Sequence, residues 1–373
     1  MLLVPPHGTA AEAAANAPGR PTADQARKLE DYKQARQQFD DEAEAYWTAV
    51  SQMRRQRNIK RRNNQEILID DYVLTQPPVY AGPPPVDPST PPTELPARKY
   101  VPVIADFLKS AREHFNFVPQ RPQSELEFKR AYAKAAVAAG LTRDQIVRIY
   151  GFETGGNGTY DTQAGLEYVT PNAHAISPAL GYNQLLNTNS VELLAERGDE
   201  FIKALKASAA RLSGGARTAL DAKIEVLGRM IEFCRAVPDD WNEHDMLANT
   251  PRGLGIHALV LDLDVGPLLQ TQKLVDSVVF ARRKGYRGVL SAAELEMMNL
   301  PGDGNGLDMV MMPAAMRAQV PTSNFFLRAS YARNPVAIRN NVVAKLFAAT
   351  NAKMDKEASL QGAKDLAAAV SSP

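Results

Sequence analysis

The chain of 373 residues has little of the chemistry on which disulfide-bonded and metal-binding proteins rely: it contains one cysteine, Cys234, and five histidines. A single cysteine excludes an intrachain disulfide framework but leaves the compartment open, because many periplasmic proteins also lack disulfides. No spacing of His, Cys and carboxylate residues is typical of a zinc site, and no Walker motif or nucleophile elbow is present. We therefore expect no metal and no cofactor.

The chain also lacks net charge and long apolar runs. Its formal net charge is +1, so no overall field favours nucleic acid, and we expect no nucleic-acid partner. No apolar run reaches the roughly 18 residues that indicate a transmembrane helix. The first residues lack a basic n-region and do not form a clear signal peptide. The composition, 45% hydrophobic and 23% charged, is that of an ordinary globular protein.

Strand patterns are few as well, whereas helix signals are frequent. Capping boxes begin at Ser124, Thr142 and Ser291, each with Glu or Gln three residues later. Asp303 to Asp308 lacks the spacing and the closing Glu of a calcium loop, so we interpret this segment as a turn. The sequence therefore predicts a mainly α fold. The expected helices cover residues 101–115, 124–139, 142–153, 191–212, 216–237, 267–286, 291–298 and 340–369.

Composition divides the chain. Residues 73–98 hold nine of the 26 prolines, and proline fixes φ and removes amide donors, so we expect an extended linker or a strap there. We predict five segments on this basis: a disordered start (1–22), an amphipathic and basic helical segment (23–72), the proline-rich linker (73–98), a catalytic domain (99–345) and an Ala-rich tail (346–373).

The segment before the linker carries a heptad-like stripe between positions 29 and 53, irregular because Arg36 interrupts it. This stripe predicts either one helix packed on the main domain or a coiled coil that forms a homodimer through residues 29–53. Six basic residues follow between Arg54 and Arg62. They are typical of a solvated helix end, although such a cluster also suits an anionic lipid, nucleic acid or glycan.

The most informative stretch covers residues 151–186. Glu153 ends an apolar helical segment, and burial among apolar side chains raises the pKa of a carboxyl group. A rigidly held, protonated carboxylic acid can donate its proton to a glycosidic oxygen. Gly155, Gly156 and Gly158 follow, and we expect them to leave room for a polymer. The alternative is a helix-terminal Glu that accepts only local backbone hydrogen bonds.

Two linked motifs carry a family resemblance. Glu153-Thr154 is followed by Ser177-Pro178-Ala179-Leu180-Gly181-Tyr182-Asn183-Gln184-Leu185-Leu186. This order resembles the lysozyme-like superfamily, and most closely its lytic transglycosylase and goose-type lysozyme branch. The Glu-Thr-Gly-Gly element is also similar to the acid region of family 19 chitinases. The resemblance implies a lysozyme-like helical domain preceded by the N-terminal helix and linker, and an envelope or periplasmic protein that cleaves the β-1,4 bond between N-acetylmuramic acid and N-acetylglucosamine of peptidoglycan.

The resemblance also implies roles for individual residues. Glu153 matches the catalytic acid and base. Tyr331 stands nearest to the family's late tyrosine, in a motif whose Asn is displaced. Tyrosine rings commonly stack on sugars, so Tyr168 is added from its position in the loop. The expected substrate-binding residues are Ser177, Gly181, Tyr182, Asn183, Gln184, Tyr168 and Tyr331.

The second carboxylate distinguishes the mechanisms. Asp161 is the candidate second acid, although it stands beside a glycine turn and is more typical of a turn residue. Lytic transglycosylases need no second acid, because the substrate's N-acetyl group assists and the same Glu then acts as base. Three functions remain open: a lytic transglycosylase, a chitinase-like or muramidase hydrolase, and a non-catalytic glycan-binding or scaffold protein.

Overall fold

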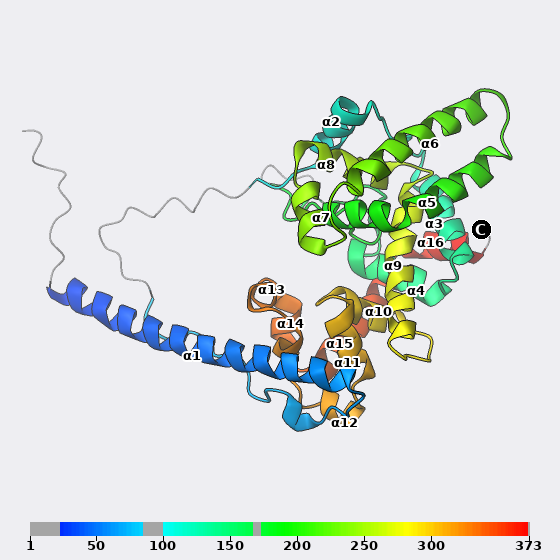
Figure 1. The fold of residues 1–373 in the computed structure, drawn as a ribbon. Coiled ribbons are helices and arrows are strands. Elements are labelled where there is room, and N and C mark those ends of the chain that lie inside the picture. The colour runs from blue at the N-terminus through cyan, green and yellow to red at the C-terminus, as the bar shows by residue number, and fades with distance from the viewer. Residues whose placement is uncertain (1–22, 85–99, 167–172, 372–373) are drawn as a thin grey trace, which may run out of the picture. The chain divides into compact units, whose positions relative to one another are not determined.

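A computed structural model describes residues 23–84, 100–166 and 173–371 (Figure 1). The described chain is mainly helical, as predicted. It divides into two compact units, residues 1–99 and residues 100–373. The expected disordered start, most of the linker and Tyr168 lie outside the described residues. Within the described ranges no helix is both long and apolar enough to cross a membrane, and no group of three His, Cys, Asp or Glu side chains is arranged to hold a metal ion.

The first unit consists of one long helix and a strap that runs back along it. Helix α1 spans Ala23–Arg62, and a short 3-10 helix, η1, spans Ile69–Asp71. The Tyr46 hydroxyl donates to the carbonyl of Thr75 at 3.1 Å. Further along, the Tyr80 ring meets the edge of Phe39 with 5.5 Å between ring centroids. The start of the proline-rich segment is therefore a strap on α1.

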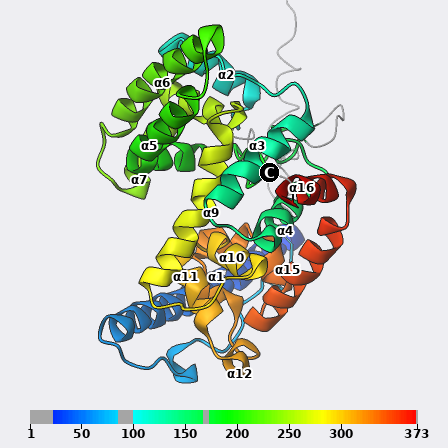
Figure 2. The same ribbon diagram turned by 90° about the vertical axis from the view of Figure 1, so that its right-hand side faces the viewer.

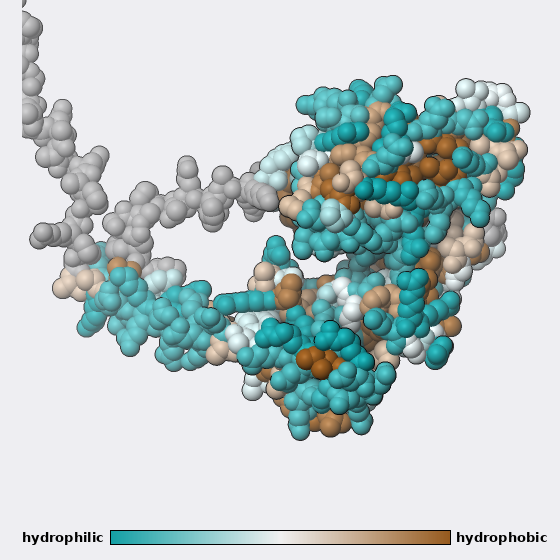
Figure 3. Space-filling model, viewed as in Figure 1, coloured by the Kyte–Doolittle hydropathy of each residue, from teal (hydrophilic) through white to brown (hydrophobic). Residues whose placement is uncertain are grey.

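The strap lies against the predicted stripe. Stripe positions other than Arg36 are the less exposed positions of α1, and the Arg36 guanidinium lies over the Phe39 and Tyr80 rings. Most other α1 residues are exposed, which gives this unit the largely hydrophilic surface in Figure 3. The stripe thus has contacts within its own chain, and a homodimer through residues 29–53 stays a prediction.

The basic end of α1 differs from a solvated helix end. Arg57 is fully buried, donates to the carbonyl of Asp71 at 2.8 Å and stacks over the Tyr72 ring at 4.3 Å. Lys60 pairs with the Asp71 carboxylate at 2.7 Å. Two of the six bases therefore fix the turn from α1 into the strap, because a buried guanidinium needs acceptors and a ring to offset its lost hydration.

The second unit is a set of packed helices (Figures 1 and 2). The only β-type pairing among the described residues consists of isolated bridges, such as that between Gln163 and Leu180. The helices are α2 (Ile104–Phe115), α3 (Glu125–Ala138), α4 (Arg143–Thr154), α5 (Asn187–Ala209), α6 (Gly214–Cys234), α7 (Trp241–Ala248), α8 (Pro251–His257), η2 (Ala258–Leu261), α9 (Gly266–Arg283), α10 (Ala292–Asn299), α11 (Asp303–Met311), α12 (Ala314–Arg317), η3 (Thr322–Phe325), α13 (Arg328–Ala332), α14 (Pro335–Arg339), α15 (Val343–Ala358) and α16 (Gln361–Ser371).

Local capping signals set several of these boundaries. Thr142 and Ser291 form the predicted capping boxes with Gln145 and Glu294. The main hydrophobic cluster joins α2, α5, α6, α8 and the start of α9, with fully or nearly fully buried side chains such as Phe107, Val191 and Leu227. Helix α9 continues beyond this cluster and contacts α3, α10 and α11 (Figure 2). It therefore connects the main cluster to the helices that carry the site.

The prediction of a separate Ala-rich tail at 346–373 was wrong. Helix α15 packs against α4 and α10, and α16 packs against α3 and α4. Leu346, Met354 and Leu366 are fully buried. The small residues of this segment permit close helix contact, since a Cβ on Gly362 would lie 2.7 Å from the carbonyl oxygen of Gly156. Alanine and glycine here permit close helix packing and do not indicate a separate tail.

The predicted turn at residues 303–308 was also wrong. These residues begin α11, and the Asp303 carboxylate accepts a hydrogen bond from the Ser277 hydroxyl at 2.8 Å. Gly306 lies against the backbone of α10, where a Cβ would come within 2.2 Å of the Met298 Cα atom. Packing against α10 and the hydrogen bond of Asp303 stabilise a helix here, although glycine has a low helix propensity.

Candidate active site

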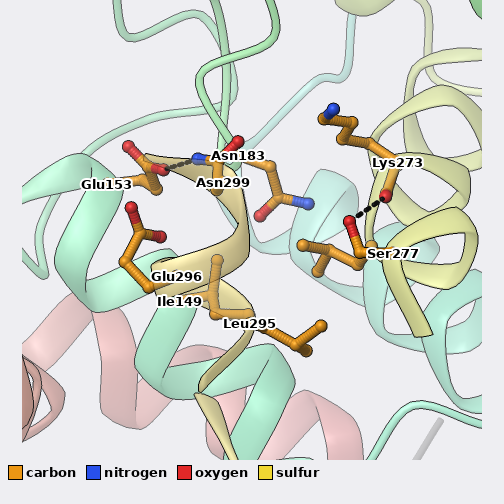
Figure 4. Close-up of a pocket in the computed structure, with 9 residues that line it drawn as sticks. Ile149, Glu153, Asn183, Lys273, Ser277, Leu295, Glu296 and Asn299 are labelled. Atoms are coloured by element: carbon orange, nitrogen blue, oxygen red, sulfur yellow. Dashed lines mark hydrogen bonds between the residues drawn. The ribbon is translucent and has the colours of Figure 1, made fainter. Parts of the chain in front are cut away.

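Glu153 stands in the last turn of α4. That helix begins at the Thr142 capping box and ends where Gly155 adopts a left-handed conformation, with φ of 66°. Glu153 is half-buried, and its Oε1 accepts a hydrogen bond from the Asn299 Nδ2 at 3.0 Å. Asn299 ends α10, so the two helix ends meet at this contact (Figure 4). The hydrogen-bond partner of Glu153 is therefore a side chain of another helix and not the local backbone.

The feature that sets this site apart is a second carboxyl group. Glu296, on α10 and 2% exposed, lies beside Glu153 and lines the same pocket (Figure 4). Burial and the adjacent carboxylate raise the pKa of Glu153 well above its ordinary value. Burial likewise raises the pKa of Glu296, to about 7, against the opposing effect of its hydrogen bonds. Because two carboxylates in direct contact repel, the pair retains one proton near neutral pH.

One cation moderates the pair. Lys353, on α15, lowers the pKa of both carboxyl groups through its charge. Its ammonium group is held nearby, since it donates to the Phe152 carbonyl at 2.9 Å and lies 3.9 Å from the centre of the Phe152 ring. Lys353 also lies 3.9 Å from the Glu357 carboxylate, so its single charge does not compensate a fully ionised Glu153–Glu296 pair as well. The surroundings of the pair therefore favour a state in which one of the two carboxyl groups stays protonated.

The pair lines a small pocket that is partly open to solvent and has a cavity volume of about 10 Å³, roughly the space for one water molecule. Figure 4 shows Glu153, Glu296 and Asn299 on one side and Lys273 and Ser277 of α9 on the other. Asn183 also lines it, so the pocket contains a residue of each linked sequence motif. The nine lining residues are Ile149, Glu153, Asn183, Lys273, Leu274, Ser277, Leu295, Glu296 and Asn299.

Asn183 is rigidly held at the pocket. Its backbone N–H donates to Gln270 Oε1 and its Nδ2 to the Gln270 carbonyl, both at 2.9 Å. The same Nδ2 lies 3.0 Å from the Tyr132 hydroxyl. These contacts fix Asn183 between α3 and α9. Its position is therefore set before any ligand binds, which lowers the entropy cost of binding.

The neighbouring motif residues have structural roles in place of the predicted sugar contacts. Tyr182 is fully buried, its ring packs on Tyr150 with 4.8 Å between centroids, and its hydroxyl donates to Glu125. Gly181 has φ of 80°, and a Cβ there would lie 2.5 Å from Gln270 Nε2. The packing of Tyr182 and the positive φ of Gly181 shape the turn that carries Asn183. Because its ring is buried, Tyr182 has no face free to stack on a sugar ring.

Gln184 and Ser177 also complete this turn. Gln184, itself left-handed with φ of 42°, donates from Nε2 to the carbonyls of Thr162 at 3.0 Å and Gly181 at 2.9 Å. The Ser177 hydroxyl accepts from the Ala179 N–H at 3.1 Å. Neither residue lines the described pocket. Both side chains satisfy backbone groups that the turn would otherwise leave unpaired.

Asp161 is not the second acid of this pocket. Its carboxylate pairs with Arg121 and accepts from the Thr159 hydroxyl at 2.7 Å. Burial and, to a smaller extent, the charge of Asp161 raise the pKa of Glu125, and Asp161 does not line the pocket of Glu153. The second carboxyl is Glu296, which sequence reasoning missed. The available signal was Glu296 itself, which stands between the apolar Leu295 and Met297, since a carboxylate on a buried helix face has to find a partner.

Tyr331 and the glycine turn also differ from expectation. Tyr331, on α13, is 5% exposed, and its hydroxyl interacts with Thr322; Glu153 has Asn299 and Glu296 as partners instead. Gly156 lies against the end of α15, where a Cβ would come within 2.3 Å of the Glu357 carbonyl oxygen. The Gly156 carbonyl accepts from the Ala363 N–H at 2.9 Å. The absence of a side chain at Gly156 therefore allows the C-terminal helices to pack closely against it, and it does not make room for a polymer.

Comparison with known proteins adds no relative: no family model, no curated protein and no solved structure matches this chain.

Proposed function

We propose that the protein is a peptidoglycan-cleaving lytic transglycosylase in which Glu153 is the single catalytic acid and base. The observation that supports this most is the pocket itself. Burial, together with the adjacent Glu296, raises the pKa of Glu153 there, and Asn183 lines the same pocket. A protonated carboxyl group beside a fixed polar side chain matches the chemistry of glycosidic cleavage. The substrate would place the protein in the cell envelope.

The proposed reaction has two steps. In the first, the bond between C1 of N-acetylmuramic acid and the leaving O4 breaks, and the Glu153 proton moves to O4. The N-acetyl oxygen of the same sugar forms a bond to C1. In the second step the sugar's own 6-hydroxyl oxygen attacks C1, the bond to the acetyl oxygen breaks, and the hydroxyl proton returns to Glu153. The product is a 1,6-anhydro sugar end.

The arrangement of the carboxyl groups supports this one-acid mechanism. Retaining hydrolases separate their carboxyl groups by about 5–5.5 Å and inverting ones by about 6.5–9.5 Å, which leaves space for the sugar or a water. Glu296 and Glu153 stand next to each other on one side of the pocket and do not face each other across it. Glu296 is suited to maintain a proton on Glu153 and not to attack the sugar from its far side.

Two alternatives are favoured by particular observations. A chitinase-like or muramidase hydrolase would use the same Glu153, with water from the open side of the pocket in place of the 6-hydroxyl. A non-catalytic glycan-binding or scaffold protein is favoured by the contacts of Tyr331, because its hydroxyl interacts with Thr322 and not with Glu153. Both alternatives keep the glycan as partner.

One experiment separates the three. Purified sacculi are incubated with the protein and with the Glu153→Gln variant, and soluble products are analysed by mass. Anhydro-sugar ends from the unaltered protein alone are the expected result, and reducing ends would identify a hydrolase. The absence of any product, together with co-sedimentation of the protein with sacculi, would leave the glycan-binding function and contradict both enzymatic ones.

A further inference from the structure

We infer that Glu296 is the positioning residue of the site: it holds the proton on Glu153 before cleavage and makes Glu153 a strong base after it. This inference rests on the proposed function, because it assigns a role within the same reaction. Glu296 is almost completely shielded from solvent, being 2% exposed. It therefore acts through Glu153 and does not touch the polymer as a nucleophile would.

Helix α10 fixes Glu296 firmly. The neighbouring Leu295, Met297 and Met298 are all buried, and α10 contacts α4, α9, α11 and α15. Asn299, next on the same helix, donates to Glu153 at 3.0 Å. The helix thus presents a carboxyl group and an amide to one glutamate. An amide donor stabilises the ionised form of Glu153 and a carboxylate destabilises it, so both protonation states have a partner ready.

The charges that surround the pair favour a single proton. Helix α15 contributes Lys353 and, 3.9 Å from its ammonium group, Glu357. Helix α9 contributes Lys273 across the pocket. Lys129 of α3 lies over the Tyr150 ring, with its Nζ 5.5 Å from the ring centre, and Asp365 of α16 acts on the Tyr150 hydroxyl. Two ionised carboxylates next to Lys353 would leave uncompensated negative charge in a buried place, whereas one proton removes it.

This arrangement serves both halves of the reaction. Before cleavage, Glu296 as a carboxylate accepts a hydrogen bond from the protonated Glu153 and keeps it in place. After Glu153 has given its proton to O4, two carboxylates face each other. Their repulsion raises the proton affinity of Glu153, which then takes the proton of the 6-hydroxyl. The pair returns to its starting state without a proton from solvent.

Carbon-detected NMR titration of the glutamate carboxyl groups tests this directly. Glu153 is assigned by its loss in the Glu153→Gln variant. In Glu296→Gln the side-chain volume and hydrogen bonding remain but the charge is gone, so the titration of Glu153 should move at least about one pH unit lower. Glu357→Gln is the matched control, because it removes a carboxylate beside Lys353 outside the pair. An unmoved Glu153 titration in Glu296→Gln would overturn the inference.

The pH–rate profile on sacculi gives the second readout. The alkaline limb, where Glu153 loses its proton, should shift to lower pH in Glu296→Gln and stay in place in Glu357→Gln. A fall in rate with an unshifted limb would indicate a merely structural role. If the unaltered protein forms no product, the proposed function fails, yet the NMR titration still decides on the pair. If Glu296→Gln does not fold, Glu296→Asp keeps the charge at a greater distance, and an unchanged Glu153 titration there contradicts the inference.

Discussion

Two neighbouring helices of the second unit each present a half-buried glutamate, and their surroundings differ. Glu125 stands at the first position of α3 and Glu153 in the last turn of α4. Glu125 accepts from the Tyr182 hydroxyl and from the Tyr160 N–H at 3.1 Å, with Lys129 nearby. Glu153 faces another carboxyl group. Burial raises the pKa of both residues.

The comparison teaches that the type of partner decides what a buried carboxyl group can do. Around Glu125 the hydrogen bonds and Lys129 oppose the effect of burial, and they favour the ionised form. Around Glu153 the adjacent Glu296 acts in the same direction as burial and favours the protonated form. Only Glu153 therefore combines a retained proton with a place in the pocket.

The largest difference between the two sites should appear when each glutamate is replaced by glutamine. Because only Glu153 donates and accepts the reacting proton, Glu153→Gln should lower the rate of product release from sacculi by about 10²–10⁴-fold. Glu125→Gln should keep the rate within about threefold, since its carboxylate holds a loop. Turbidity loss of sacculi and mass analysis of products measure both. Equal losses in the two variants would remove the distinction between the two sites.

The Glu296 pair should also make stability depend on pH. Burial raises the folded pKa of Glu296 to about 7. The stability that its protonated form contributes is therefore fully present below its unfolded pKa and is lost as pH rises through about 7. At 1.36 kcal/mol per pH unit, the free energy of unfolding should fall by up to about 3 kcal/mol across this range. Urea denaturation near pH 5 and near pH 8 measures it.

The matched comparison is Glu296→Gln, which cannot ionise and should show a smaller fall than the unaltered protein. Since other groups titrate in the same range, the difference between the two proteins is the relevant quantity. An identical pH dependence in both would show that this pair does not carry the effect.

At the Glu125 site, Tyr182→Phe should lower the free energy of unfolding and leave the titration of Glu153 unchanged. The change removes one hydrogen bond to a partly buried carboxylate while the packing on Tyr150 remains, so we expect a loss of about 1–2 kcal/mol in the free energy of unfolding. Denaturation curves and the Glu153 NMR titration measure the two quantities. A shifted Glu153 titration would mean that the two glutamates are coupled.

The smallest effect is expected at Asp161. Asp161→Asn removes the ion pair with the partly exposed Arg121, which is worth less than about 1 kcal/mol at such a position. Activity on sacculi should stay within about twofold, because Asp161 does not line the pocket. A loss as large as that of Glu153→Gln would restore Asp161 as a second acid.

The sequence predicted much of the fold because its signals act over short distances. The boxes at Thr142 and Ser291 begin helices, as expected. The stripe of α1 and the proline-rich strap were both visible in the pattern of residues. The errors lie where distant packing overrides local preference: residues 303–308 are helical against α10, and residues 346–371 are core helices.

The candidate site divides in the same way. The sequence by itself singled out Glu153 and the motif that contains Asn183, since a carboxylate at an apolar helix end and a glycine-containing turn are readable locally. Only the tertiary structure decided which side chains face them. Glu296, Asn299 and Lys353 reach Glu153 from helices far along the chain, whereas Tyr182 and Asp161 are directed to Glu125 and Arg121. Helix packing determines these partners, and no local pattern encodes the register between helices.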